Sequence, residues 1–333
     1  MNSSFKVGQH LISRNSKPFL VAEIGLNHNN DEEIGIRTIQ AAKKAGADAV
    51  KFQSYITDEF IDSHNSDVKF LYDIFKQYEL SELLHRKFQQ VAHNEGLIFF
   101  STPLCESSVD LLVSLDVPII KIASGDIVNY SLLKRVISTN KPIFISSGAA
   151  DLHEVTRAMH LLLENNVNDV CLMHCVSLYP TPLEKLNLKI ISTYKELYNC
   201  PIGFSDHSAG SIASVISVSL GASVIEKHFT LDKNLPGPDH SISVDPHEMS
   251  KLSREIHETF QALGDKIKIS HPEEISGRFY GRRSTYFKKN KFLALRPAIH
   301  LKDKAVLDSW EIEKIQNKSM VKGEGPVRLN DID

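Results

Sequence analysis

The sequence predicts an α/β fold: a (β/α)8 TIM barrel followed by a small C-terminal module that is mostly β. Eight short apolar runs each end on a charged or hydroxylic residue. The runs are nearly continuous in hydrophobicity, as expected of parallel strands that are covered on both faces. Stretches with helical periodicity lie between most of them. The 333 residues exceed a bare barrel of roughly 250 residues, which leaves room for the extra module.

The strands and helices alternate along the chain. The predicted strands occupy residues 18–25, 48–53, 97–102, 118–124, 142–147, 169–175, 201–207 and 222–228. In 153–163, Val155, Met159 and Leu162 recur at three- and four-residue steps, which predicts a helix. Residues 245–263 show the same spacing and form the last predicted barrel helix. An insertion at 54–79 follows the second strand and is expected to shape the rim of a pocket.

The organisation of the chain changes near residue 265. We assign residues 1–270 to a catalytic barrel and 271–333 to a linker and a shortened C-terminal domain. In the tail, KFLAL (291–295) and KAVL (304–307) have β-type composition with turn signals between them. About fifty residues bury little core alone, so the tail is expected to dock on another surface.

Composition excludes several classes of partner. A net charge of -3 gives no reason to expect nucleic acid or an anionic membrane. The N-terminus has no long apolar segment and no run approaches a membrane span, so we expect a cytoplasmic protein. Cys105, Cys171, Cys175 and Cys200 show no CxxC pairing and are expected to be buried, reduced thiols.

The ends of the predicted strands carry the chemistry. TIM barrels place their active sites at the C-terminal ends of the strands. The predicted tips are Glu23, Lys51, Thr102, Lys121, Ser146, His174, His207 and His228. These side chains are therefore expected to surround one mouth.

His207 and His228 end adjacent strands, which predicts a metal site. Neutral imidazole is the commonest metal ligand, and neighbouring strands bring two rings within reach of one ion. Two imidazole nitrogens, with the carboxylates of Glu23 and Glu226 nearby, suit a divalent cation such as Mn²⁺ that keeps open coordination positions for water and substrate. A closed zinc site would want four ligands.

Lys51 and Lys121 each end a buried run, where an ammonium group needs an anionic partner. One interpretation is a structural ion pair with Glu23 or Asp126. The other is that both bind a phosphate or carboxylate of a small polyanionic substrate, helped by hydroxyl groups. These hydroxyls belong to Thr102, Ser124, Ser146 and Ser205. Glu23 is either a general acid/base or the partner of Lys51.

Seven blocks of the barrel resemble, in order, the signature blocks of the sialic acid synthase family. They are AEIGLNHN (22–29), VKFQ (50–53), FSTP (100–103), KIASGD (121–126), HCVSLYPTP (174–182), GFSDHS (203–208) and EKHFTLDKNLPGPDHSIS (226–243). Seven colinear blocks are far more specific than any one of them.

The resemblance implies condensation of phosphoenolpyruvate with an N-acyl amino sugar, such as N-acetylmannosamine, to give a nonulosonic acid and phosphate. It implies Mn²⁺, or else Mg²⁺ or Co²⁺, on His207 and His228. Glu23 would be the acid/base residue, acting with Lys51, Lys121 and Glu226. Phosphoenolpyruvate would contact Lys51, Thr102, Lys121, Ser124 and Ser205. The sugar side would involve Glu226, Asp126, Ser177, Tyr179 and Asp239, with Gln53 and Ser146 as further substrate-binding residues.

Two residues depart from the sialic-acid-forming pattern, which has Glu where this chain has Asp126 and Asn where it has Ser177. Legionaminic and pseudaminic acid synthases therefore stay open, as do a 3-deoxy sugar-acid phosphate synthase and a non-catalytic sugar-binding homologue.

Members of the family end in an antifreeze-like (SAF) domain that swaps across a homodimer and inserts an arginine into the partner's site. Arg296 is the first candidate for that residue and Arg283 the second.

Overall fold

The computed structural model describes residues 1–315 and 324–332. The chain divides into two compact units, 1–264 and 265–333, each of which is considered by itself.

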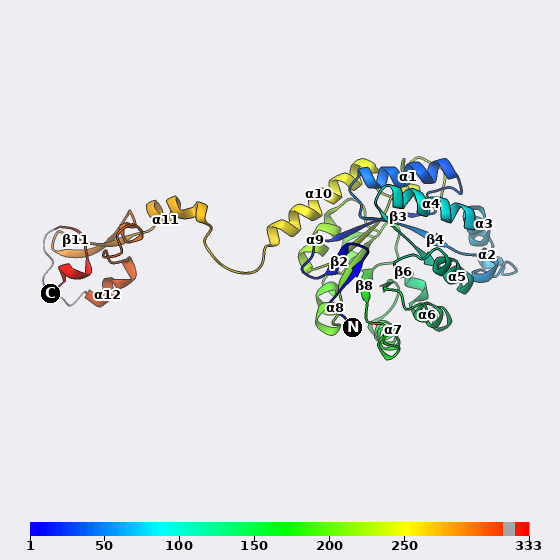
Figure 1. The fold of residues 1–333 in the computed structure, drawn as a ribbon, viewed down its shortest axis with the longest axis horizontal. Helices are drawn as coiled ribbons and strands as arrows, with labels where there is room; N and C mark the ends of the chain where they lie inside the picture. Colours follow the sequence, from blue (N-terminus) through cyan, green and yellow to red (C-terminus); the bar gives the residue numbers. More distant parts are fainter. Residues whose placement is uncertain (316–323, 333) are drawn as a thin grey trace. The chain divides into compact units, whose positions relative to one another are not determined.

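The first unit is a closed barrel of parallel strands in the order β10-β3-β4-β5-β6-β7-β8-β9 (Figure 1). All eight predicted strands are confirmed: β3 Phe19–Gly25, β4 Ala49–Ser54, β5 Ile98–Pro103, β6 Ile120–Ile122, β7 Ile143–Ser146, β8 Val170–Cys175, β9 Ile202–Asp206 and β10 Val224–His228. Every residue of β3, β7 and β8 is buried, because the interior side chains cover one face and the helices cover the other.

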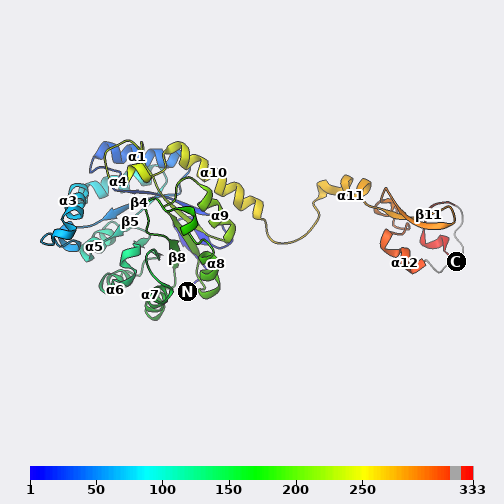
Figure 2. The same ribbon diagram turned by 180° about the vertical axis from the view of Figure 1, so that it is seen from behind.

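Helices form the outer layer around the strands, as both views show (Figures 1 and 2). They are α1 Glu32–Lys44, α4 Glu82–Asn94, α5 Glu106–Ser114, α6 Tyr130–Ile137, α7 Leu152–Glu164, α8 Ile190–Leu197, α9 Ile212–Leu220 and α10 Pro246–Leu263. The two helices predicted at 153–163 and 245–263 are confirmed. Asp151 and Asp245 begin α7 and α10 with capping boxes, which satisfy backbone N–H groups that have no partner inside the helix.

A hairpin of β1 (Ser4–Val7) and β2 (His10–Ser13) closes the amino end of the barrel. Phe5, Val7 and Ile12 are buried in one cluster with residues at the starts of the strands. The ring of Phe5 meets the edge of Phe144 from β7, with 6.4 Å between ring centroids. This end of the barrel is therefore a packed apolar core.

The predicted insertion at 54–79 folds into α2 (Thr57–Phe60), the short 3₁₀ turn η1 (Ser66–Val68) and α3 (Lys69–Tyr78). Its aromatic side chains Tyr55, Phe60 and Phe75 pack on one another, with ring centroids 5.1–5.3 Å apart. Leu104, at the pocket, joins this cluster. The insertion thus supports one side of the barrel mouth.

The second unit has a three-stranded sheet in the order β12-β11-β13, with β11 Ser284–Lys288, β12 Lys291–Leu295 and β13 Gly325–Pro326. The strand predicted at 291–295 is confirmed. The strand predicted at 304–307 is wrong, because Val306 makes only an isolated bridge to Arg328 while Leu307 packs into a small core. The expected linker includes a helix, α11 (Ile275–Gly281). Residues 316–323 of the predicted C-terminal domain lie outside the described residues.

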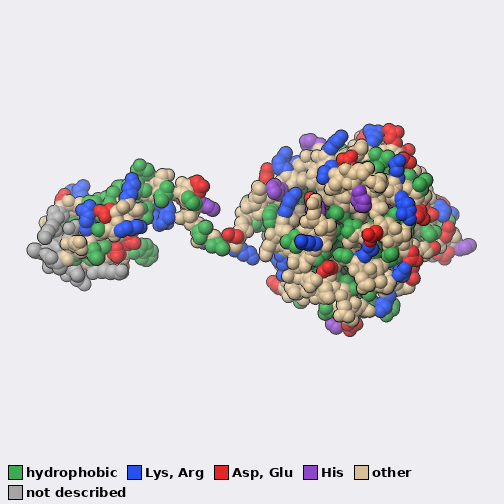
Figure 3. Space-filling model, in the orientation of Figure 1, with side chains coloured by type: hydrophobic (Ala, Val, Ile, Leu, Met, Phe, Trp, Pro, Cys, Tyr) green, Lys and Arg blue, Asp and Glu red, His purple; other side chains and the backbone are tan. Residues whose placement is uncertain are grey.

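The cysteines are buried, as composition led us to expect. All four cysteines are buried and free, so they form no disulfide. Basic and acidic side chains are mixed over the visible face of the barrel unit (Figure 3). No helix within the described ranges is long and apolar enough to cross a membrane.

Candidate active site

A cavity of about 190 Å³ opens at the carboxyl ends of the barrel strands. Its wall contains most of the predicted site residues: Glu23, Lys51, Gln53, Thr102, Lys121, Ser124, Ser146, Ser177, Tyr179, Ser205, His207, Glu226 and His228. The sheet register brings them together, since Glu23 lies beside Lys51 on one side and His228 on the other, and Glu226 lies beside Ser205.

Two lysines and two glutamates form a charge cluster at the bottom of the pocket. Lys51 Nζ lies 2.9 Å from Glu23 Oε2 and 3.8 Å from Glu226 Oε2. Lys121 Nζ lies 3.5 Å from Glu226 Oε1. All four side chains are at most 5% exposed, so solvent screens these charges little. Lys51 also donates to Thr102 Oγ1 at 2.8 Å.

The two carboxyl groups have opposite electrostatics. Burial raises the pKa of Glu23, although the ammonium group of Lys51 opposes the shift. Burial would also raise the pKa of Glu226, but Lys121 and Lys51 outweigh it and lower that pKa to about 2. Glu226 is therefore a fixed anion, while Glu23 is the carboxyl that is suited to carry a proton, the division of roles typical of an acid/base site.

The two lysines also differ. Burial would lower the pKa of Lys51, but Glu226 and Glu23 together raise it, so Lys51 is a permanent cation. Among the described residues, Glu226 is the one carboxylate within ion-pair distance of Lys121, and burial lowers the pKa of Lys121. An anionic ligand of the pocket would supply the negative charge that Lys121 lacks.

His207 and His228 lie side by side on the pocket wall, with ring centroids 5.6 Å apart. His207 Nδ1 lies 2.9 Å from the carbonyl oxygen of Val176, which can only accept, so Nδ1 carries the proton and Nε2 keeps its lone pair. Burial, helped by His228, lowers the pKa of His207 to about 3 and keeps this ring neutral. His228 Nδ1 is buried without a hydrogen-bond partner among the described residues.

These two imidazoles are the side chains best placed to hold a metal ion. The described residues contain no group of three His, Cys, Asp or Glu side chains arranged to hold one. An ion bound by His207 and His228 would thus have coordination positions left for water or substrate oxygen, unlike a closed structural site. The unpartnered nitrogen of His228 and the available lone pair of His207 fit such an ion.

Tyr179 covers the imidazole pair. Its ring stacks on His207, with centroids 4.2 Å apart, and meets His228 nearly at right angles, with centroids 5.9 Å apart. Its place at the pocket wall is therefore beside the possible metal site.

Hydroxyl groups line the opposite wall. Ser146 Oγ is buried and has no partner among the described residues, which leaves it available to a ligand. Ser124 Oγ accepts from the backbone N–H of Gly148 at 3.0 Å. A Cβ at Gly148 would lie 2.5 Å from Ser177 Oγ and 2.6 Å from Ser124 Oγ, so any larger residue there would require these hydroxyl groups to move.

Three predicted residues do not line the cavity itself. Asp239 lies at the rim of the cavity, with its Oδ2 3.8 Å from His228 Nδ1. It is also close to Glu23 and Gln53, since a Cβ added at Gly25 would lie within 3.3 Å of all three side chains. Asp126 accepts from Asn129 at 3.1 Å and lines an adjoining hollow of about 740 Å³. Arg296 is an exposed residue of the second unit.

The prediction for the sixth strand was wrong in one respect. His174 was expected at the mouth, but its ring stacks on Phe204 with centroids 5.8 Å apart, and its Nε2 lies 2.7 Å from Leu186 O. The predicted and the observed strand both end on Cys175, and the thiol of Cys175 lines the pocket instead. The alternation of side chains along a strand was the signal for this, since neighbouring residues face opposite sides.

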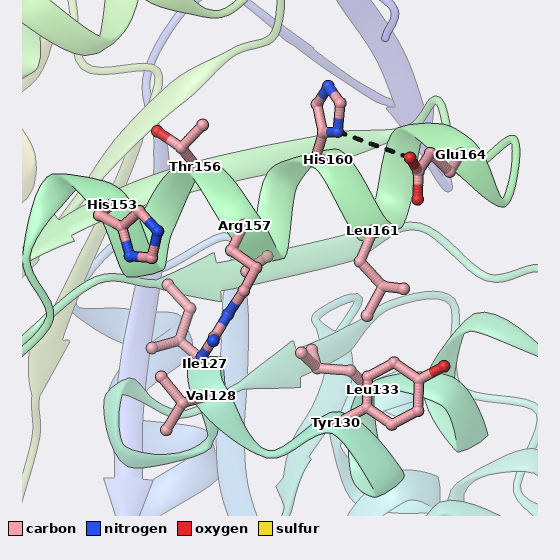
Figure 4. Close-up of a pocket in the computed structure, with 11 residues that line it drawn as sticks. Ile127, Val128, Tyr130, Leu133, His153, Thr156, Arg157, His160, Leu161 and Glu164 are labelled. Carbon is pink, nitrogen blue, oxygen red and sulfur yellow. Dashed lines mark ion pairs between the residues drawn. The ribbon is translucent and has the colours of Figure 1, made fainter.

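A second hollow, of about 560 Å³, lies on the outer wall between α6 and α7 (Figure 4). Leu133, Leu161 and Ile127 form apolar parts of its lining, Arg157 reaches across it, and His160 pairs with Glu164 at its edge. It lacks the buried acid and base groups of the strand-end pocket. The hollow with the larger volume is therefore not the candidate active site.

Comparison with known proteins agrees with this geometry. The chain is 45% identical over 285 residues to an uncharacterized protein, MJ1065, from Methanocaldococcus jannaschii, covering 86% of this chain and 83% of that one. It is 37% identical to the N,N'-diacetyllegionaminic acid synthase of Legionella pneumophila, covering 82% and 80% of the two chains. A structure titled as N-acetylneuraminic acid (sialic acid) synthetase from Leptospira borgpetersenii, in complex with citrate, superposes with a TM-score of 0.78 at 32% identity, covering 83% of this chain and 95% of the other. Residues 38–268 match the NeuB family, and the chain belongs to that family.

Proposed function

We propose that this protein is a nonulosonic acid synthase, a transferase that condenses phosphoenolpyruvate with an N-acyl amino sugar and releases phosphate. The observation that carries the proposal is the cluster of Lys51, Lys121, Glu23 and Glu226 in one cavity with His207 and His228. The names of the related synthases from Legionella and Leptospira support the same reaction class.

The two lysines of the pocket suit the donor. Lys51, Lys121 and the free hydroxyl of Ser146 would bind the phosphate and carboxylate of phosphoenolpyruvate, with Thr102, Ser124 and Ser205 nearby. The anion would complete the charge balance of Lys121. Holding both reactants in one cavity removes much of the entropic barrier of a two-substrate step.

The carboxyl groups suit the chemistry. The enol carbon of phosphoenolpyruvate attacks the sugar aldehyde, and positive charge then develops at the enol-ether carbon, where the fixed anion Glu226 stabilises it. Glu23, with its raised pKa, would deliver or accept the proton near the aldehyde oxygen. Water adds at the cationic carbon, and phosphate leaves toward Lys51 and Lys121. Gln53 would orient Glu23, since its Nε2 donates to Glu23 Oε1 at 3.2 Å.

A divalent cation, Mn²⁺ before Mg²⁺ or Co²⁺, would be held by His207 and His228. When bound, it would polarise the sugar aldehyde as a Lewis acid. Tyr179 and Asp239 lie beside this position and would contact the sugar.

The charges around the mouth favour an acceptor without phosphate. Lys51 and Lys121 are the only Lys or Arg residues among the described lining residues of the pocket and the adjoining hollow. The hollow instead carries Glu59, Glu106 and Asp126. A second phosphate would meet these carboxylates, which disfavours a 3-deoxy sugar-acid phosphate synthase.

We further propose a homodimer in which the second unit serves the partner's barrel and Arg296 reaches the partner's pocket. The exposed apolar side chains of this unit, among them Trp310 at 88% exposure, support its docking on another surface. Light scattering of the full chain would test the oligomeric state, and Arg296→Ala would weaken turnover without changing that state.

The decisive experiment is a phosphate-release assay with phosphoenolpyruvate, a panel of N-acyl amino sugars with and without phosphate, and added Mn²⁺. We expect release with an unphosphorylated acceptor and its loss in His207→Ala and His228→Ala. His160→Ala, which changes an exposed histidine on the outer wall, is the control. Undiminished turnover in His228→Ala would refute the metal assignment. Sugar binding without phosphate release would identify a non-catalytic homologue.

A further inference from the structure

A buried ion pair lies behind the two imidazoles, on the helix-facing side of β9 and β10. Lys227 Nζ is 2.9 Å from Asp206 Oδ2, with the side chains 2% and 0% exposed. Asp206 Oδ2 also accepts from Ser214 Oγ of α9 at 2.6 Å, so the pair faces the helix layer. Neither residue lines the pocket.

The pair brackets His207. Asp206 precedes it and Ser208 follows it, and Asp206 Oδ1 accepts from the Ser208 backbone N–H at 2.8 Å and from its hydroxyl at 2.7 Å. Lys227 donates to the Ser208 carbonyl at 2.5 Å. The backbone on both sides of His207 is thus held by one ion pair.

The same pair reaches the neighbouring strand. Lys227 lies between Glu226 and His228, and its backbone is paired with that of Asp206 in the sheet. Because side chains alternate along a strand, Glu226 and His228 point into the pocket while Lys227 points away from it. The contact of Lys227 with Ser208 therefore fixes His207 relative to His228 and Glu226.

Stability alone does not explain this pair. Moving two charges out of water is unfavourable, and replacing a buried ion pair by neutral residues is often neutral or stabilising. Other positions on this side of the same strands, such as Phe204 and Ile225, are apolar. We propose that Asp206 and Lys227 are positioning residues that set the relation of the His207 and His228 imidazoles for a shared divalent cation.

This inference rests on the metal site of the proposed function, and its test measures binding of Mn²⁺ itself. The double variant Asp206→Asn with Lys227→Met removes both charges together and keeps similar volumes, so no buried charge is left unpaired. We expect a folded protein whose dissociation constant for Mn²⁺, measured by electron paramagnetic resonance, rises by about tenfold or more, the effect typical of groups that orient metal ligands. At saturating Mn²⁺, kcat should largely recover while the apparent Mn²⁺ constant stays raised.

Two further variants separate positioning from general destabilisation. Phe204→Leu changes the same strand on the same face but leaves the Ser208 contacts in place, so it should lower the melting temperature without changing Mn²⁺ affinity. Ser208→Ala removes one hydrogen bond to Asp206 and should weaken Mn²⁺ binding several-fold even if the double variant does not fold.

The outcomes are distinct. Weakened Mn²⁺ binding in the double variant or in Ser208→Ala, with unchanged binding in Phe204→Leu, supports the positioning role. Binding within twofold of the native value in both polar variants overturns it while leaving the proposed function intact. Failure of the native protein to bind Mn²⁺, or binding that His207→Ala does not weaken, overturns the metal site and this inference together.

Discussion

Replacement of Glu226 by Gln tests the charge cluster directly. The carboxylate lies 3.5 Å from Lys121 Nζ and 3.8 Å from Lys51 Nζ, and the three side chains are at most 5% exposed. Removing one partner of a buried ion pair is destabilising by about 3–5 kcal/mol, because it leaves an uncompensated buried charge. For a domain of this size, 1 kcal/mol corresponds to about 2–4 °C in melting temperature, so we expect a fall of roughly 10 °C.

Inorganic phosphate makes this prediction sharper. An anion that binds Lys51 and Lys121 would replace the missing charge, so phosphate should stabilise Glu226→Gln more than it stabilises the native protein. Ligand at a hundred times its dissociation constant adds about 2.7 kcal/mol. Differential scanning calorimetry with and without phosphate measures both effects.

Glu82→Gln is the matched control, because it breaks an exposed pair with Arg86 that is expected to contribute no more than about 1 kcal/mol. A melting temperature for Glu226→Gln within about 2 °C of the native value would refute the electrostatic reasoning. Equal stabilisation of both proteins by phosphate would show that the lysines do not bind the anion.

Two other predictions concern stability and pocket shape. Burial lowers the pKa of His28 from 6.5 to about 3, so its contribution to stability is present above about pH 6.5 and is lost as the pH falls toward 3. Between pH 7 and pH 5, the free energy of unfolding measured with urea should fall by about 2 kcal/mol more in the native protein than in His28→Gln. Equal falls in the two proteins would show that His28 does not cause the pH dependence. Gly148→Ala should sharply reduce phosphoenolpyruvate binding, because its methyl group would meet Ser124 and Ser177, whereas Gly277→Ala, with open space around it, should bind normally. Calorimetric titration checks both, and tight binding in Gly148→Ala would mean that the hydroxyls move aside.

Much of the barrel could be predicted because its strands are nearly continuous apolar runs with polar tips. The same pattern located Glu23, Lys51, Lys121, His207 and His228, since parallel strands place their carboxyl ends at one mouth. A continuous apolar run, however, does not show which of its residues face the barrel interior and which face the helices. It therefore did not show whether His174 or Cys175 faces the interior, which the side-chain alternation in the structure decides.

Other features depend on contacts that spacing along the chain does not reveal. Asp126 lines the adjoining hollow because it lies in the 3₁₀ turn η2 (Ser124–Val128), which the spacing of residues along the chain did not reveal, and its contact with the sugar stays a prediction. The strand predicted at 304–307 was wrong because composition alone does not supply a pairing partner. Within the part of the chain that the structure describes, Val306 makes a single isolated bridge, to Arg328. The Asp206–Lys227 ion pair was not predicted, because each of these residues stands between two site residues in the sequence and nothing in the spacing shows that they contact each other.

The β1–β2 hairpin closes the barrel at one end. Phe5, Val7 and Ile12 fill the amino side of the barrel, and the cavity that carries the charge cluster lies at the carboxyl ends of the strands. Because no residue of the hairpin lines the cavity, a change in the hairpin should alter the stability of the barrel and leave the lining of the cavity as it is.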